Sequence, residues 1–136
     1  MRVVFDTNIF ISAFYFGGNP KIVLDMVTAG IDELFISKEI TDEILSVMTR
    51  PKFNTDIKYV EYFIKSIEEI SESVMTNGTI AGSRDSDDNK ILECALFAKA
   101  DYIITGDDDL LSLKSFKNVS IVSPNEYIEK ISKRGL

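Results

Sequence analysis

The chain has 136 residues, of which 45% are hydrophobic and 27% charged, as in a typical soluble globular protein. This length suits a single domain over residues 1–136, and no apolar run approaches the roughly 20 residues of a membrane-spanning helix. The net charge is −7, and the absence of histidine excludes histidine catalysis and histidine metal ligands. The lone Cys94 fits a reducing compartment, and an acid at position 6 is too early for a signal peptide, so we expect a cytoplasmic protein.

The first half of the chain alternates short apolar strands with helices. A strand over 2–5 stops at the turn formers Asp6, Thr7 and Asn8. Asn19 as N-cap and Pro20 at the first helical position predict a helix that ends at Gly30. The pattern then predicts a strand over 34–36, a helix from a Ser37 cap to about residue 49, and an amphipathic helix over 57–70.

The second half continues the alternation. We expect a weak strand over 73–75, a polar loop over 77–88, a helix from about 89, a strand over 102–105, a helix over 110–116, a strand over 119–122, and a closing helix from Pro124. This order predicts an α/β fold, a three-layer α/β/α sandwich with a short central parallel β-sheet. In such sheets, ligands bind beyond the carboxyl ends of the strands, where the strand order reverses.

Acidic residues follow two of the predicted strands at that end. Asp6, which could cap the next helix, follows the first strand, and Asp107, Asp108 and Asp109 follow the strand over 102–105. Two like charges a few Å apart repel by roughly 4 kcal/mol at an effective dielectric of about 20. Capping the helix from Leu110 uses one carboxylate, for which Asp109 is the natural choice, so two aspartates need another explanation.

Two further groups of acids are ambiguous taken singly. Glu43 lies on or beside a core-facing stripe, where it could reach solvent, reach Arg50 or join a site. In the segment 85–88, one aspartate is expected to cap the helix near residue 89. A calcium loop is rejected there, because Lys90 and Leu96 stand where that loop needs Gly and Glu. Jointly, acids at the sheet end and a glutamate from a flanking helix fit a cation site with oxygen ligands, for Mg²⁺ or Mn²⁺.

Four segments carry a resemblance to a known family. They are "VVFDTNIFISAF", "SKEITDEILSVMTRPKF", "RDSDDNKILECALFAKADYIITGDDDLL" and "VSIVSPNEYIEKI". Together they resemble the PIN-domain family of metal-dependent ribonucleases, especially small prokaryotic toxins of toxin–antitoxin pairs. One departure is Ser86, where this branch commonly has proline. The resemblance implies a PIN-like fold and four acids, Asp6, Glu43, Asp88 and Asp107, with Asp109 and Thr105 as auxiliary members.

The resemblance also implies a chemistry and partners. RNA phosphodiester hydrolysis would use one or two Mg²⁺ or Mn²⁺ ions. Asp6, Asp88 and Asp107 would be ligands, and Glu43 a ligand or an acceptor for water at the ion, while Asp109 could complete a second site. Asn8 and Thr105 would orient these ligands from behind. Candidate contacts to the RNA backbone, otherwise ordinary surface charges, are Arg50, Lys52, Arg84 and Lys90.

A cognate antitoxin and a homodimer follow from the same resemblance. The residues themselves offer only Phe14, Tyr15 and Phe16, which could line a groove for a partner or belong to the core.

Two rival functions stay open. A haloacid-dehalogenase-like phosphatase also has an aspartate after the first strand, but Asn8 stands where that mechanism needs a second aspartate as general acid. A receiver domain is discounted, because no lysine ends the last strand at Val122-Ser123-Pro124. The same fold could also serve as a non-catalytic RNA-binding or interaction module, against which the complete acid set argues.

Overall fold

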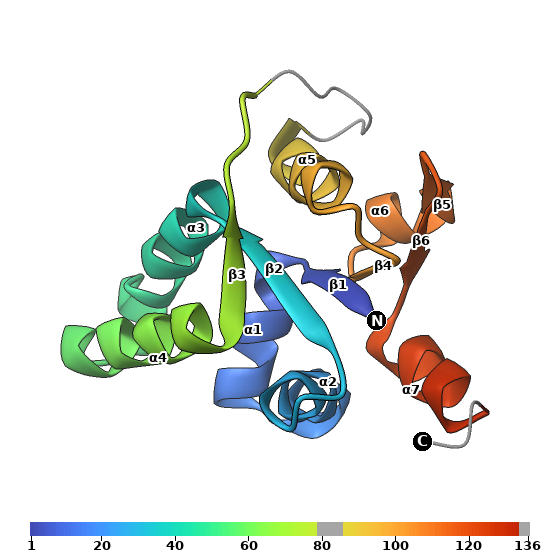
Figure 1. The fold of residues 1–136 in the computed structure, drawn as a ribbon. Helices are drawn as coiled ribbons and strands as arrows, with labels where there is room; N and C mark the ends of the chain where they lie inside the picture. The colour runs from blue at the N-terminus through green and yellow to red at the C-terminus, as the bar shows by residue number, and fades with distance from the viewer. Residues whose placement is uncertain (79–85, 134–136) are drawn as a thin grey trace.

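A mostly parallel β-sheet forms the centre of the fold (Figure 1). The computed structural model describes residues 1–78 and 86–133, and within them six strands pair in the order β3-β2-β1-β4-β6-β5. The five parallel strands are β1 (Arg2–Phe5), β2 (Glu33–Ser37), β3 (Ser71–Val74), β4 (Tyr102–Ile104) and β6 (Val119–Val122). The short β5 (Ser115–Phe116) runs antiparallel to β6 at one edge.

Helices cover both faces of this sheet (Figure 1). One face carries α1 (Thr7–Tyr15), α2 (Gly18–Thr28), α3 (Lys38–Met48), α4 (Ile57–Ile70) and α7 (Pro124–Ser132). The other carries α5 (Asn89–Ala98) and α6 (Asp108–Leu113). Consecutive side chains of β1, from Val3 to Phe5, are at most 1% exposed, as expected for a parallel strand covered on both faces. The predicted three-layer α/β fold is confirmed.

The strand order reverses at β1, which lies in the middle of the sheet. From β1 the chain builds outward through β2 to β3, then crosses to the other side of β1 to form β4 and β6. The backbone N–H of Asp6 donates to the carbonyl oxygen of Ile104 at 2.9 Å, so the ends of β1 and β4 are tied together. A crevice at this switch point is where α/β sheets bind ligands.

Most predicted elements are present, and the helix starts need correction. The strands over 2–5 and 119–122 and the helix over 57–70 have the predicted bounds. The helix α2 begins at Gly18 rather than after Asn19, because Gly17 and Gly18 take the positive φ angles with which the chain turns into it. The third strand begins two residues earlier than predicted, at Ser71.

The segment after β4 also differs from the prediction. The helix α6 begins at Asp108 and ends at Leu113, so Phe116 lies in β5 and not in a helix. Asp107, and not Asp109, is its cap. Of the predicted loop over 77–88, residues 79–85 lie outside the described residues, and Ser86–Asp88 form a 3₁₀ turn. A second 3₁₀ turn covers Pro51–Phe53. No described helix combines the length and the apolar character needed to cross a membrane.

Candidate metal centre

The carboxylate of Asp6 lies buried at the carboxyl end of β1. Its side chain is at the N-cap position of α1 but makes no capping hydrogen bond there. It instead accepts a hydrogen bond from the Thr105 hydroxyl at 2.8 Å. Burial is the main cause that raises the pKa of Asp6, and the charges of Asp107 and Glu43 raise it further, while the Thr105 hydrogen bond opposes them. Asp6 is therefore held out of water beside other acids.

Thr105 links two of the predicted acids. It directly follows β4 and is fully buried. Its Oγ1 donates to Asp6 Oδ2 and accepts the backbone N–H of Asp107 at 2.9 Å. One hydroxyl thus fixes the end of β1 relative to the loop that carries Asp107, so it positions both acids.

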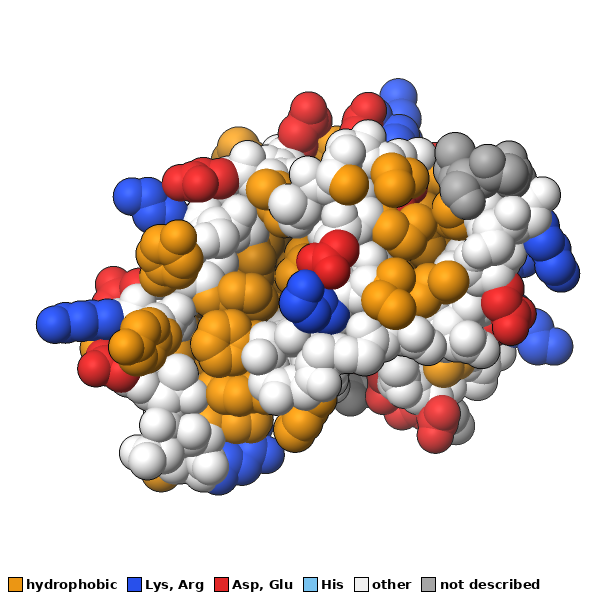
Figure 2. All heavy atoms as spheres, turned by 90° about the horizontal axis from the view of Figure 1, so that it is seen from below, with side chains coloured by type: hydrophobic (Ala, Val, Ile, Leu, Met, Phe, Trp, Pro, Cys, Tyr) orange, Lys and Arg blue, Asp and Glu red, His pale blue; other side chains and the backbone are white. Residues whose placement is uncertain are grey.

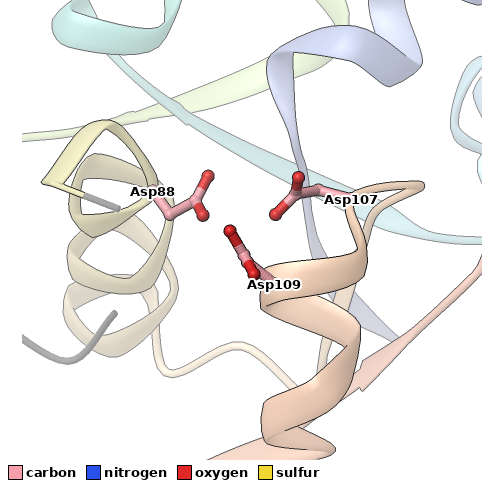
Figure 3. A group of neighbouring side chains, drawn as sticks. All are labelled: Asp88, Asp107 and Asp109. Carbon is pink, nitrogen blue, oxygen red and sulfur yellow. The ribbon is translucent and has the colours of Figure 1, made fainter. Parts of the chain in front are cut away.

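Three aspartates form a cluster at the ends of α5 and α6 (Figure 3). The carboxylates of Asp88, Asp107 and Asp109 point toward one another, and their nearest oxygens lie within 4.8 Å of each other. Asp88 is only 8% exposed and takes the N-cap position of α5 without a capping bond from its side chain. Asp107 caps α6, because its Oδ2 accepts the N–H of Leu110 at 3.0 Å. Asp109 comes from the first turn of α6, and Asp108 is exposed.

Glu43 reaches the same region from α3. It is half-buried, and its Oε2 lies 3.1 Å from the Nζ of Lys90, a residue of the first turn of α5. Lys90 also donates to the carbonyl oxygen of Asp87 at 2.7 Å. The sequence offered solvent or Arg50 as the partner of Glu43, but the observed partner comes from a helix far away in the chain. Lys90 therefore faces the acids with a side chain only 19% exposed.

One cavity of about 310 Å³ joins the four predicted acids. Its lining includes Asp6, Glu43, Asp88 and Asp107, which come from four separate segments of the chain. Asn8, Arg50 and Lys52 also line it, and all three are exposed. Asp109 instead lines a neighbouring cavity of about 730 Å³, which shares Asn8 and Asp107 with the first. Arg84 lies outside the described residues.

The donor set of the acid cavity fits a hard divalent cation. Its charged ligand atoms are all carboxylate oxygens, the donors that Mg²⁺ and Mn²⁺ prefer. The Thr7 hydroxyl, which belongs to the same lining, is buried and has no hydrogen-bond partner within the described residues. A bound cation would offset the mutual repulsion of the carboxylates. Sequence reasoning missed Thr7, because a threonine beside a turn has no signal of its own.

Comparisons with known proteins agree with this geometry. The family model of the PIN domain matches residues 2–109, a range that includes Asp6, Glu43, Asp88, Asp107 and Asp109. Among solved structures, a chain from the crystal structure of VapBC2 from Rickettsia felis bound to a DNA fragment from their promoter superposes with a TM-score of 0.62. The two chains are 16% identical over 89% of this chain and 97% of the other, a likeness that shows the fold. No curated protein matches the sequence.

Proposed function

Because the chain belongs to the PIN-domain family, we propose that it is a Mg²⁺- or Mn²⁺-dependent endoribonuclease that hydrolyses RNA phosphodiester bonds at the acid cavity. The observation that carries this proposal is the convergence of Asp6, Glu43, Asp88 and Asp107 on one cavity at the switch point of the sheet. Four carboxylates from distant segments are costly to gather, and a cation is the ordinary reason for gathering them.

Each acid has a proposed role in this chemistry. Asp88, Asp107 and Asp109, whose oxygens already approach one another, would hold the ion, with Asp6 as a further ligand. When bound, the ion supplies positive charge that activates water and stabilises the charge developing on the phosphate. Thr105 orients Asp6 through its hydroxyl. Glu43 is placed to accept a proton from the attacking water, and Lys90 holds its carboxylate in position.

Basic side chains at the mouth of the cavity suit an RNA backbone. Arg50 and Lys52 line the acid cavity and are exposed, so their charges can meet the phosphates on either side of the scissile bond. Lys90 forms an ion pair with Glu43, so we assign it a role in positioning Glu43 rather than in contacting the RNA backbone. Arg84 stays a candidate from the sequence alone.

We further propose that the chain is the toxin of a toxin–antitoxin pair. The fold likeness to a chain of the VapBC2 structure supports this, as does an exposed aromatic surface on α1 and α4. Phe16, Tyr62 and Tyr59 are 80%, 74% and 67% exposed, and Phe14 packs against Phe63 in a tilted pair with ring centroids 4.8 Å apart. Figure 2 shows hydrophobic side chains gathered on this side of the molecule. Such a surface suits a protein partner, an antitoxin or a second copy in a homodimer.

The test is cleavage of a panel of structured and unstructured RNAs with Mg²⁺, Mn²⁺ or EDTA. We expect wild-type protein to cut RNA internally with either metal, and the Asp88→Asn and Glu43→Gln variants to lose at least about a hundredfold in rate. Calorimetry should show Mn²⁺ binding that Asp88→Asn largely abolishes. The matched control is Asp42→Asn, which removes an exposed carboxylate one position from Glu43 on the same helix.

Three results would contradict the proposal. Cleavage that persists in EDTA, or in Asp88→Asn at the wild-type rate, points to a contaminating nuclease. Hydrolysis of a small phosphomonoester without cleavage of RNA supports the phosphatase alternative. RNA binding without cleavage under any metal condition supports the non-catalytic module.

A further inference from the structure

A second cavity adjoins the acid cavity and has a different chemical character. It measures about 730 Å³, within the usual size of ligand pockets, and lies between the first turns of α1, α2 and α7 and the loop from β4 to α6. It shares Asn8 and Asp107 with the acid cavity. A chain of nucleotides with one phosphate over the acids would therefore place a neighbouring nucleoside here.

The lining of this cavity is rich in neutral hydrogen-bonding groups. Three carboxamides, from Asn8, Asn19 and Asn125, stand around it, and within the described part of the chain none of them has a hydrogen-bond partner in the protein. Each offers two donors and an acceptor. Ser123 also contributes: its Oγ accepts the N–H of Glu126 at 3.2 Å, which leaves its hydroxyl proton free to donate. This set can pair with the edge of a base and with ribose hydroxyls.

The remaining lining argues for a base rather than a phosphate. None of the residues that line this cavity in the described structure is a lysine or arginine, whereas Arg50 and Lys52 line the acid cavity. Asp108 stands at this cavity outside the group of three aspartates, and its exposed carboxylate would repel phosphate and accept hydrogen bonds from ring or amino N–H groups. Ile9 and Pro124 are buried apolar residues of the same lining, against which a base can pack.

We propose that this cavity is a base-specificity subsite, which holds one unpaired nucleoside next to the scissile phosphate and recognises its edge through Asn19, Asn125 and Asp108. The inference rests on the proposed nuclease function, whose substrate it narrows to RNA that is single-stranded at the cut. Because the Asp108 carboxylate can only accept, it pairs with an N–H donor on the base edge, either the amino group of adenine, cytosine or guanine or the ring N–H of guanine or uracil.

The first experiment sequences the ends of products from a randomised RNA pool. We expect wild-type protein to show a base preference at one position beside the cut. Asn19→Ala and Asn125→Ala should each reduce this preference by about fivefold or more, raising KM for a preferred oligonucleotide more than they lower kcat. Asp108→Asn, which replaces an acceptor-only carboxylate with an amide that also donates, should change which base is preferred. The matched control is Asn118→Gly, which removes an exposed amide from the turn between β5 and β6 and keeps its positive φ angle accessible.

A second measurement does not depend on cleavage. In EDTA, side-chain amide resonances of Asn19 and Asn125 are followed by ¹H–¹⁵N NMR during titration with trinucleotides of each base. Base-dependent shifts of these two amides, with Asn118 unmoved, support the subsite even if no RNA is cut, in which case the nuclease proposal alone fails. Cleavage with an unchanged base preference in all three variants, together with no amide shifts, overturns the subsite and leaves the nuclease proposal standing.

Discussion

The charge of Asp107 should destabilise the protein when no metal is present. Its carboxylate lies within 4.8 Å of those of Asp88 and Asp109, and at that distance two unit charges repel by about 3.5 kcal/mol at an effective dielectric of 20. Asp107 and Asp109 are partly exposed, so solvent screening removes much of this repulsion. Asp107→Asn keeps a side-chain oxygen to cap α6 and loses roughly 0.3 to 1 kcal/mol of charge–dipole attraction.

The net expectation for Asp107→Asn without metal is a gain of about 1 to 3 kcal/mol in the free energy of unfolding, or a melting temperature higher by roughly 4 °C or more. The measurement is thermal and urea unfolding in EDTA, followed by circular dichroism. Adding Mn²⁺ at about a hundred times its Kd should stabilise wild type by about 2.7 kcal/mol and the variant far less. The difference in free energy of unfolding between the variant and wild type should therefore shrink or change sign when Mn²⁺ is present.

The matched control is Asp108→Asn, which alters an exposed carboxylate outside the group of three and should change stability by less than about 0.5 kcal/mol. A lower melting temperature for Asp107→Asn in EDTA would refute the reasoning. It would mean that the Asp107 charge is compensated inside the protein, and that the three aspartates are structural partners rather than an incomplete cation site.

Three further predictions follow from single contacts. Burial raises the pKa of Asp6 above its usual 3.8, so metal-free wild type should lose stability relative to Asp6→Asn as the pH rises from below about 4 toward neutrality. Urea unfolding of both proteins at each pH measures this. A difference in free energy of unfolding between the two proteins that stays constant with pH would contradict it. Thr105→Val should cost about 1 to 3 kcal/mol of stability and weaken Mn²⁺ binding about tenfold by calorimetry, while Thr105→Ser, which keeps the hydroxyl, should stay within about threefold in affinity. Burial raises the pKa of Cys94 to about 12, so a colorimetric disulfide reagent at pH 8 should label this thiol only after the protein unfolds. Rapid labelling of the native protein would contradict this prediction and would show that the helix α5 opens.

The sequence was sufficient to predict the architecture because hydrophobic alternation is a local signal. Short, mostly apolar segments such as 2–5 and 119–122, bounded by turn formers, favour buried strands, and the apolar stripe over 57–70 repeats with the period of a helix. Helix starts were less predictable, because several neighbouring residues can cap. Asp107, Asp108 and Asp109 are all good N-caps, and only the path of the chain after Thr105 selects Asp107.

Some contacts of the candidate site could likewise be predicted from the sequence, and others could not. Asp6 and Asp107 could be paired from the sequence, since each follows a strand and parallel strands end at one edge of the sheet. The partner of Glu43 could not, because Lys90 comes from α5 on the opposite face of the sheet, 47 positions along the chain, and no helical spacing relates the two. The buried hydroxyl of Thr7 was equally hidden, because its lack of a partner is a property of its surroundings.

The ion pair of Glu43 and Lys90 shows how this site can exist before any metal binds. The acids gather against their mutual repulsion, and the half-buried ammonium of Lys90, 3.1 Å from Glu43, offsets the charge of that carboxylate at the edge of the cavity. The hydroxyl of Thr105 stabilises the Asp6 carboxylate by donating a hydrogen bond to it, without adding a charge. Asp88, Asp107 and Asp109 form a separate group, in which one oxygen from each lies within 4.8 Å of the others. A divalent cation placed where these three carboxylates face each other would be attracted by all three at once, so this is where we expect it to bind.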